Sequence, residues 1–250
     1  MKAVVFLLTL VLTSCVSSAR SPTLEPEHLH LAVPSGELLD YLRYAAQGDV
    51  RVVWVSSERG QAEAELAAAR ELAKRGVEVW MVDLTFSYVL DLGRKGLDRV
   101  PPEDIRALLN RAGVHKKVVV VALGRAAVPL LAAYGTWRPE EGRPRKLEFV
   151  LVHPNLYEQA EPFQDARYLE LGNLEGAWLL ILQPRRSAGF VWLDQQGEAL
   201  RKHGASVQNE VLERVREGFW ARQDATAHEI EVSQRFGELI WDGLARMKQE

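Results

Sequence analysis

The sequence predicts an α/β fold of the doubly wound type, in which a mostly parallel sheet is covered by helices and preceded by an antiparallel hairpin. Apolar runs of strand length alternate with amphipathic helical segments from residue 51 onward. The strands are apolar almost throughout, as in Val118-Val-Val-Val121, which is typical of a sheet buried on both faces. The chain has 250 residues and no fixed-period repeat, so one domain of this kind accounts for most of its length.

The N-terminal segment predicts export and lipid attachment. After Lys2 an apolar run reaches Leu12, and Leu12-Thr-Ser-Cys15 resembles the lipobox of bacterial lipoproteins. Because Cys15 is the only cysteine, we expect residues 1–14 to be a signal peptide and acyl chains such as palmitate on Cys15 to anchor the protein. The alternative is an ordinary secretory signal with an incidental cysteine. Val16 is not the Asp that retains such lipoproteins at the inner membrane, so the resemblance implies a periplasm-facing protein of the outer membrane.

Charge and cysteine content exclude several classes of function. The net charge is −3 at pH 7 and falls to about −4 once residues 1–14, with their single lysine, are removed. This balance argues against a nucleic-acid partner. A lipidated Cys15 leaves no thiol for a disulfide or a zinc-cysteine site. His28 and His30 have metal-ligand spacing but no visible third ligand, so we expect neither a metal nor a cofactor.

The elements before residue 51 form a tether and a hairpin. Residues 15–27 lack periodicity and contain two prolines, so they are interpreted as a lipidated tether, and residues 28–250 as the folded domain. Residues 28–33 alternate polar and apolar side chains like a half-buried strand. Residues 38–44 are expected to close a hairpin with that strand, although residues 38–46 also fit a short helix.

The elements after residue 50 alternate between strand and helix. A strand at 51–56, a helix at 61–75 that ends before Gly76, and a strand at 77–82 form a βαβ unit. The remaining expected elements are a helix at 102–112, a strand at 117–122, a helix at 125–134, strands at 148–152 and 178–183, a helix at 193–203, a strand at 206–212 and a helix from about 226 to 247. Residues 136–146 are expected to form a surface loop.

Two stretches carry a resemblance to a known family. Arg51-Val-Val-Trp-Val-Ser-Ser-Glu-Arg-Gly60 is a strand that enters a loop ending in glycine, and residues 72–84 form the next helix-strand unit. With the leading hairpin, this order resembles the α/β-hydrolase superfamily over nearly the whole chain after the tether. The resemblance implies that the loop at 56–60 belongs to an oxyanion hole and that residues 155–173 form a lid.

The catalytic triad that the resemblance implies is degenerate. The turn Val121-Ala-Leu-Gly-Arg-Ala-Ala127 matches the nucleophile elbow, but Gly124 occupies the place of the nucleophile. Arg186, in Pro184-Arg-Arg-Ser187, stands where the family often places its acid, and Glu217 stands where the family has histidine before Gly-Phe. A glycine has no oxygen with which to attack an acyl carbon, so we expect the usual acyl-enzyme route to be closed.

Arginines near the expected strand ends suggest a binding site. A helix that begins at the Gly124 turn leaves free N–H groups, and arginine forks suit carboxylate or phosphate. The candidate anion-binding residues are Arg59, Gly124, Arg125, Arg185 and Arg186. The alternative is that these arginines form ordinary ion pairs with Glu58, Asp83 or Glu217.

The sequence therefore predicts a lipid-anchored pseudo-hydrolase that binds a small acidic ligand or an envelope protein. The alternative is an active esterase or thioesterase with a displaced nucleophile. The candidate hydroxyls are Ser56, Ser57, Ser87 and Ser187, none of which the sequence pairs with a base. His153 either caps a strand end or faces the cleft. Trp137, Trp192 and Trp220 would form a binding surface if they were exposed together.

Overall fold

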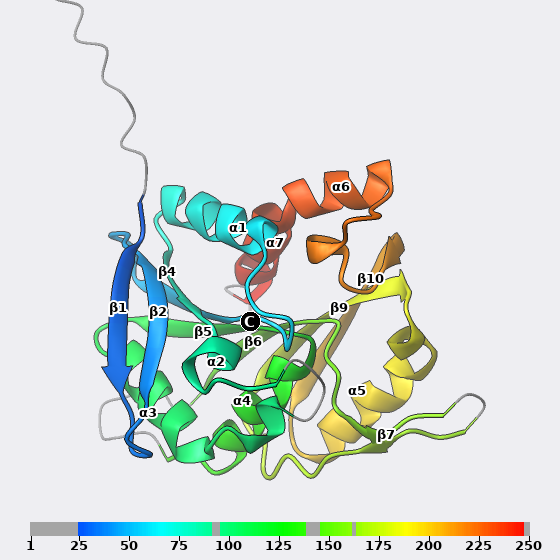
Figure 1. Ribbon diagram of the computed structural model, residues 1–250. Helices are drawn as coiled ribbons and strands as arrows, with labels where there is room; N and C mark the ends of the chain where they lie inside the picture. The colour runs from blue at the N-terminus through cyan, green and yellow to red at the C-terminus, as the bar shows by residue number, and fades with distance from the viewer. Residues whose placement is uncertain (1–24, 92–95, 139–145, 162–163, 248–250) are drawn as a thin grey trace, which may run out of the picture.

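The computed structural model describes residues 25–91, 96–138, 146–161 and 164–247. Within these residues the main sheet has eight strands, in the order β1-β2-β4-β3-β5-β6-β9-β10 (Figure 1). Its strands are β1 (Glu27–Ala32), β2 (Leu38–Tyr44), β3 (Val50–Val55), β4 (Glu78–Val82), β5 (Lys117–Leu123), β6 (Glu148–Val152), β9 (Trp178–Arg186) and β10 (Ser206–Arg216). The segment expected to be a signal peptide, residues 1–14, and Cys15 lie outside the described residues.

The sheet has the direction pattern that the sequence predicts. β1 pairs with β2 in antiparallel fashion and β2 pairs with β4 in the same way, while the strands from β4 to β10 are parallel. Residues 38–44 are therefore a hairpin strand and not a helix. This confirms the mostly parallel α/β fold with its N-terminal hairpin.

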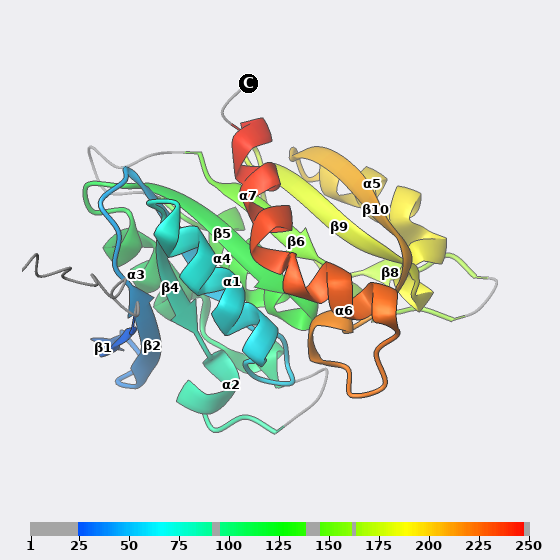
Figure 2. The ribbon, with the colours of Figure 1, turned by 90° about the horizontal axis from the view of Figure 1, so that it is seen from above.

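Helices cover both faces of the sheet. They are α1 (Glu63–Lys74), α2 (Leu84–Ser87), α3 (Pro102–Ala112), α4 (Ala127–Gly135), α5 (Leu193–Lys202), α6 (Ala227–Gln234) and α7 (Phe236–Met247). Figure 2 shows α1 and α7 lying across one face, and α3, α4 and α5 lie against the other (Figure 1). Alternate residues of β5 point to opposite faces of the sheet. Val120 packs into the core beneath α3 and α4, and Val121 packs into the core beneath α1 and α7. Both valines are fully buried, which explains the continuous apolar run.

Several elements differ from the sequence prediction, and one of them is β9, which continues past the expected residue 183 to Arg186. The expected helix from about 226 to 247 is two helices, α6 and α7, separated at Arg235. The break lets Phe236 turn into the core, where its ring lies 5.2 Å from that of Trp54. The helix expected at 125–134 begins with a 3₁₀ turn at Gly124–Ala126. β10 continues past residue 212 to Arg216, beyond a bulge at which Arg214 has a φ of 60°.

The expected lid contains a small antiparallel hairpin, β7 (Tyr157–Gln159) and β8 (Arg167–Tyr168). The rings of Tyr157 and Tyr168 lie 5.4 Å apart, and the ring of Tyr157 lies 5.7 Å from that of Trp192. Most of the loop expected at 136–146 and the tip of this hairpin fall outside the described residues. In the described part of the chain, no helix has the length and apolar character needed to cross a membrane.

Candidate functional site

A cavity of about 430 Å³ opens at the carboxyl ends of β3, β5, β6 and β10. This is the edge at which open α/β sheets bind their ligands. Its charged and polar lining comes from the loops that follow these strands. Those residues are Ser57, Glu58, Arg59, His153, Asn155 and Glu217. Gly124 also lines the cavity, at the turn after β5.

Gly124 forms the sharp turn after β5 that the sequence matched to a nucleophile elbow. Its φ of 56° lies in the left-handed region that favours glycine. A Cβ atom at this position would lie 2.8 Å from Oε2 of Glu58 and 3.4 Å from Cβ of Ser57. The space in which a nucleophilic side chain would begin is therefore already taken by the Glu58 carboxylate.

Glu58 also accepts a hydrogen bond from the backbone donor next to Gly124. The backbone N–H of Arg125 donates to Oε2 of Glu58 over 3.0 Å. In hydrolases with a nucleophile elbow, the N–H of the residue after the nucleophile is one half of the oxyanion hole. Here a carboxylate of the same chain accepts this hydrogen bond. The sequence did not reveal this contact, because it joins loops that are 67 residues apart.

The Arg125 side chain points into the protein and not into the cleft. It is only 2% exposed, and its Nε and Nη2 donate to the Asp98 carboxylate over 2.8 and 2.6 Å. Its Nη1 donates to the carbonyl oxygens of Asn155 and Tyr157 over 2.9 and 2.7 Å. Arg125 is thus a structural anchor for the lid, and it is not available as an anion ligand. Its partner is Asp98 rather than Glu58, Asp83 or Glu217.

The structure does not bring the other candidate arginines together. Arg59 is exposed at the rim, where its Nη1 lies 3.5 Å from the position that a Cβ on Gly218 would take. Arg185 and Arg186 are exposed at the end of β9 and do not line the cavity, and the Arg185 guanidinium stacks 4.2 Å from the Phe190 ring. Of the expected anion-binding side chains, the cavity therefore contains only that of Arg59.

His153 and Glu217 face each other across the cavity. Nε2 of His153 lies 3.7 Å from Oε2 of Glu217, which comes from the loop after β10. Burial lowers the pKa of His153, although the nearby carboxylates of Glu217 and Glu58 oppose that effect. Burial therefore favours the neutral form of the imidazole. His153 lines the cavity, which agrees with the interpretation that it faces the cleft, and its backbone N–H extends the pairing of β6 with β9 by donating to the Leu182 carbonyl over 2.9 Å.

The candidate serines have local partners. Ser57 lines the cavity, and its Oγ accepts the N–H of Arg59 over 3.3 Å. Ser56 donates to Glu65, while Ser87 and Ser187 donate to the backbone carbonyls of Asp83 and Pro184; none of these three lines the cavity. In the described residues, no hydrogen bond joins any of these serines to a histidine.

A buried carboxylate supports the loop below Ser57. Glu65 is fully buried and accepts hydrogen bonds from Nε1 of Trp54, Oγ of Ser56 and the N–H of Ala62, over 2.9, 2.8 and 3.1 Å. Burial raises the pKa of Glu65 to about 7 despite these three donors. Its position in the first turn of α1 was visible in the sequence, but its burial was not.

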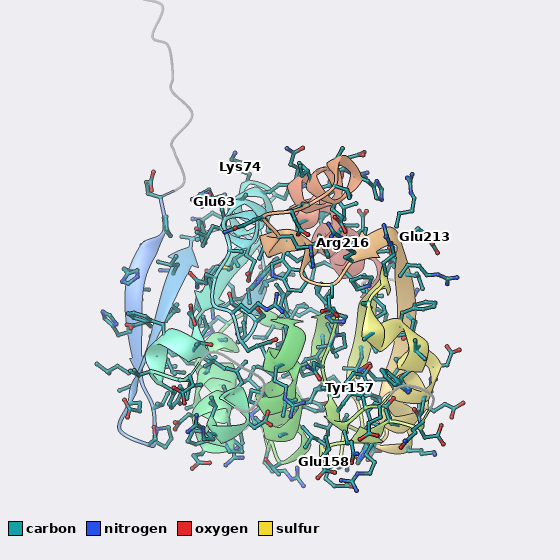
Figure 3. The ribbon with its side chains drawn as sticks, turned by 45° about the vertical axis from the view of Figure 1, so that its right-hand side comes forward. Glu63, Lys74, Tyr157, Glu158, Glu213 and Arg216 are labelled. Atoms are coloured by element: carbon teal, nitrogen blue, oxygen red, sulfur yellow. The ribbon has the colours of Figure 1, made fainter. Side chains whose placement is uncertain are left out.

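The aromatic residues divide between the cavity and the core. Trp192 and Trp220 line the cavity together with Tyr157, whereas Trp137 is buried elsewhere and donates to Asn110 over 3.0 Å. Tyr157 lies near the yellow ribbon of the α5 region (Figure 3). The surface of three exposed tryptophans considered from the sequence is therefore absent from the described residues.

Metal binding finds no support in the described part of the chain. No group of three histidine, aspartate, glutamate or cysteine side chains is placed there to hold an ion. His30 lies on β1 with its Nδ1 next to the Asp40 carboxylate, and it is exposed.

Comparison with known proteins identifies the architecture. No family model matches the sequence, and neither does any curated protein. An esterase from Pyrobaculum calidifontis is similar in structure, with a TM-score of 0.60 and 13% identity over 85% of this chain and 84% of that one. A putative dienelactone hydrolase from Klebsiella pneumoniae has a TM-score of 0.60 and 16% identity over 86% of this chain and 96% of that one. The esterase LipW from Mycobacterium marinum has a TM-score of 0.61 and 13% identity over 88% of this chain and 82% of that one. The chain therefore has the α/β-hydrolase fold.

Proposed function

We propose that this protein is a lipid-anchored protein of the bacterial cell envelope whose hydrolase-like cleft binds a ligand and does not carry out serine acyl transfer. One observation carries the second part of the proposal. The Glu58 carboxylate fills the space beside Gly124 and accepts the Arg125 N–H that a serine hydrolase needs for its oxyanion. An acyl substrate would find neither a serine at the elbow nor a free donor at this position.

The order of the ionisable groups supports the same proposal. Glu217 stands at the position that the resemblance assigns to the general base, and the imidazole of His153 comes from the loop after β6 instead. A carboxylate at this position lacks the N–H with which histidine protonates a leaving group. The site thus retains a cleft and loses all three side chains of the usual chemistry.

A fluorophosphonate probe tests for serine chemistry directly. The purified full chain is incubated with the probe beside an active serine esterase, and labelled peptides are identified by mass spectrometry. We expect the esterase to be labelled and this protein to remain unlabelled. Stoichiometric labelling of one serine would overturn the proposal and identify the nucleophile.

Ser57 is the residue on which an active hydrolase would depend. It lines the same cavity as His153, and its Cβ lies 3.4 Å from the position of a Cβ on Gly124. A displaced nucleophile at this position is therefore the second candidate function. If it were real, the probe would label the peptide that contains Ser57, and a Ser57→Ala variant would lose the label while Ser87→Ala kept it.

Lipid attachment rests on Cys15 and is tested separately. Cells that express the full chain are grown with radioactive palmitate and then fractionated into inner and outer membranes. We expect label in the wild-type protein and its recovery with the outer membrane, because Val16 is not the retention signal. A Cys15→Ala variant should lose both the palmitate label and its recovery with the outer membrane. A wild-type protein without label would contradict the proposed lipid attachment.

A further inference from the structure

The carboxylates of the cleft have no cationic partner in the described part of the chain. Glu58 accepts a hydrogen bond from the Arg125 backbone, and the Glu217 carboxylate lies 3.7 Å from Nε2 of His153. No lysine or arginine nitrogen of the described residues forms a salt bridge with either carboxylate. Charges attract each other more strongly in a partly enclosed cavity than in bulk water. The cavity therefore offers two carboxylates with which a bound cation can pair.

The remaining charges do not reverse this balance. Asp98 neutralises Arg125, and burial lowers the pKa of His153 and so favours its uncharged form. Arg59 is the only cationic side chain that lines the cavity in the described residues, and it is exposed at the rim. Two carboxylates against one guanidinium give the lining a net negative charge. An anionic ligand would meet this charge and would also compete with Glu58 for the Arg125 N–H.

Aromatic rings form the walls of the same cavity. Tyr157 and Trp192 lie with their centroids 5.7 Å apart, and Trp220 comes from the loop after β10 and packs against Phe219 at 5.2 Å. Such rings pack against the apolar part of a ligand, and their faces also attract a nearby cation. Small residues such as Ala160 and Gly189 complete the lining, and the volume of about 430 Å³ suits a small molecule.

We propose that the cleft binds a small organic ammonium ion, with its charge near Glu58 and Glu217 and its apolar part against Tyr157, Trp192 and Trp220. This inference rests on the proposed binding function and adds the charge and chemical class of the ligand. It replaces the acidic ligand that the arginine-rich sequence suggested.

Titration calorimetry with three probes of similar size tests the inference. The purified full chain is titrated with benzyltrimethylammonium, with benzyl alcohol and with benzoate at low ionic strength. We expect the cation to bind at least about tenfold more tightly than the other two, because only the cation offsets the two carboxylates. Preference for benzoate or benzyl alcohol would overturn the ammonium ligand and leave a binding cleft in place. Failure of all three probes to bind would overturn both the ammonium ligand and the binding function.

Variants identify the groups that carry the selectivity. Glu58→Gln and Glu217→Gln should each lower the affinity for the cation by about 3- to 10-fold and leave the affinity for benzyl alcohol unchanged. Trp192→Ala should lower the affinities for the cation and for benzyl alcohol together. Glu213→Gln is the matched control, since Glu213 is exposed on the edge strand β10 and does not line the cavity (Figure 3). If Glu213→Gln and Glu217→Gln lowered the affinity for the cation equally, the preference for a cation would come from the overall charge of the protein. That result would overturn the proposed site.

Discussion

The two ends of the sheet treat their carboxylates in opposite ways. At the amino ends of β3 and β4, Glu78 is 1% exposed and receives hydrogen bonds from Nε of Arg51 and Arg43 over 2.9 and 3.1 Å. Nζ of Lys116 lies 3.0 Å from its other oxygen, and Nε1 of Trp80 donates over 2.7 Å. At the carboxyl ends, Glu58 and Glu217 have no such cations in the described residues. The fold thus compensates buried charge where only stability is needed and leaves charge available where the cleft opens.

This difference is expected from the cost of burying charge. A buried carboxylate with several charge-assisted donors is satisfied within the protein, and removing one member leaves the others unpaired. A carboxylate in a cleft is partly hydrated, so it can remain charged until a ligand replaces the water. The same type of side chain therefore contributes to stability at one end of the sheet and, in the proposed function, to binding at the other.

The largest expected effect concerns Glu78. Glu78→Gln should lower the free energy of unfolding by about 3–5 kcal/mol, because three cations then lose their buried counter-charge. Chemical denaturation followed by far-UV circular dichroism measures the loss. The comparison of the two ends would fail if the loss were as small as that of Glu217→Gln.

The stability of the protein at acid pH should also depend on Glu78. Burial opposes ionisation of Glu78, but the hydrogen bonds from Arg51, Lys116 and Arg43 outweigh it and lower its pKa to about 2. A lowered pKa means that the stabilisation is present above the unfolded value of about 4.5 and is lost as the pH falls toward 2. Glu78→Gln should therefore flatten the decline in stability between pH 4.5 and pH 2.

Glu65 is an intermediate case, because it is buried like Glu78 but lacks a cation. Its pKa of about 7 means that the folded protein retains a proton that the unfolded chain releases near pH 4.5. Stability should therefore fall as the pH rises from about 4.5 to about 7, by up to about 3 kcal/mol. The measurement is the free energy of unfolding at several pH values. Glu65→Gln should remove this slope, and a wild-type slope of the opposite sign would show that Glu65 is ionised.

Local patterns in the sequence were sufficient for most of the sheet and its helices. The helix at 102–112 and the strand at 148–152 have the predicted bounds, since a proline at the first turn and a short apolar run are local signals. The break at Arg235 was missed because it depends on where Phe236 packs. Tertiary contacts of this kind leave no mark on helical periodicity.

The cleft was predictable only in part, for the same reason. Gly124 could be placed because the elbow is a short turn between a strand and a helix. The role of Arg125 could not, because its partner Asp98 follows a different strand and lies 27 residues away. Charged residues near strand ends indicate a site, but three-dimensional pairing decides which of them remain free.

Restoring a serine at the elbow tests whether Glu58 occupies the nucleophile's space. Gly124→Ser should lower the free energy of unfolding by about 1–2 kcal/mol, from the left-handed backbone and from displacement of the Glu58 carboxylate. Gly36→Ser is the control, because Gly36 has a φ of 92° and nothing lies within 4 Å of its Cβ position.

The double variant separates the two contributions. Glu58→Ala combined with Gly124→Ser should recover part of the loss, since the serine then has room. Gly36→Ser should show only the backbone cost. Simple addition of the two single effects would mean that Glu58 and the elbow do not compete for space.

The smallest expected effect on stability belongs to Glu217. Its side chain is 45% exposed, so Glu217→Gln should change the free energy of unfolding by less than about 0.5 kcal/mol. The pKa of His153 should nevertheless move, because burial lowers it while the Glu217 carboxylate raises it. Loss of that charge should therefore lower the pKa of His153 further, as measured by NMR titration of the imidazole, whereas Arg59→Gln should raise it. An unchanged pKa in both variants would mean that solvent screens the cleft charges, and that the cavity lacks the field by which a cation would be selected.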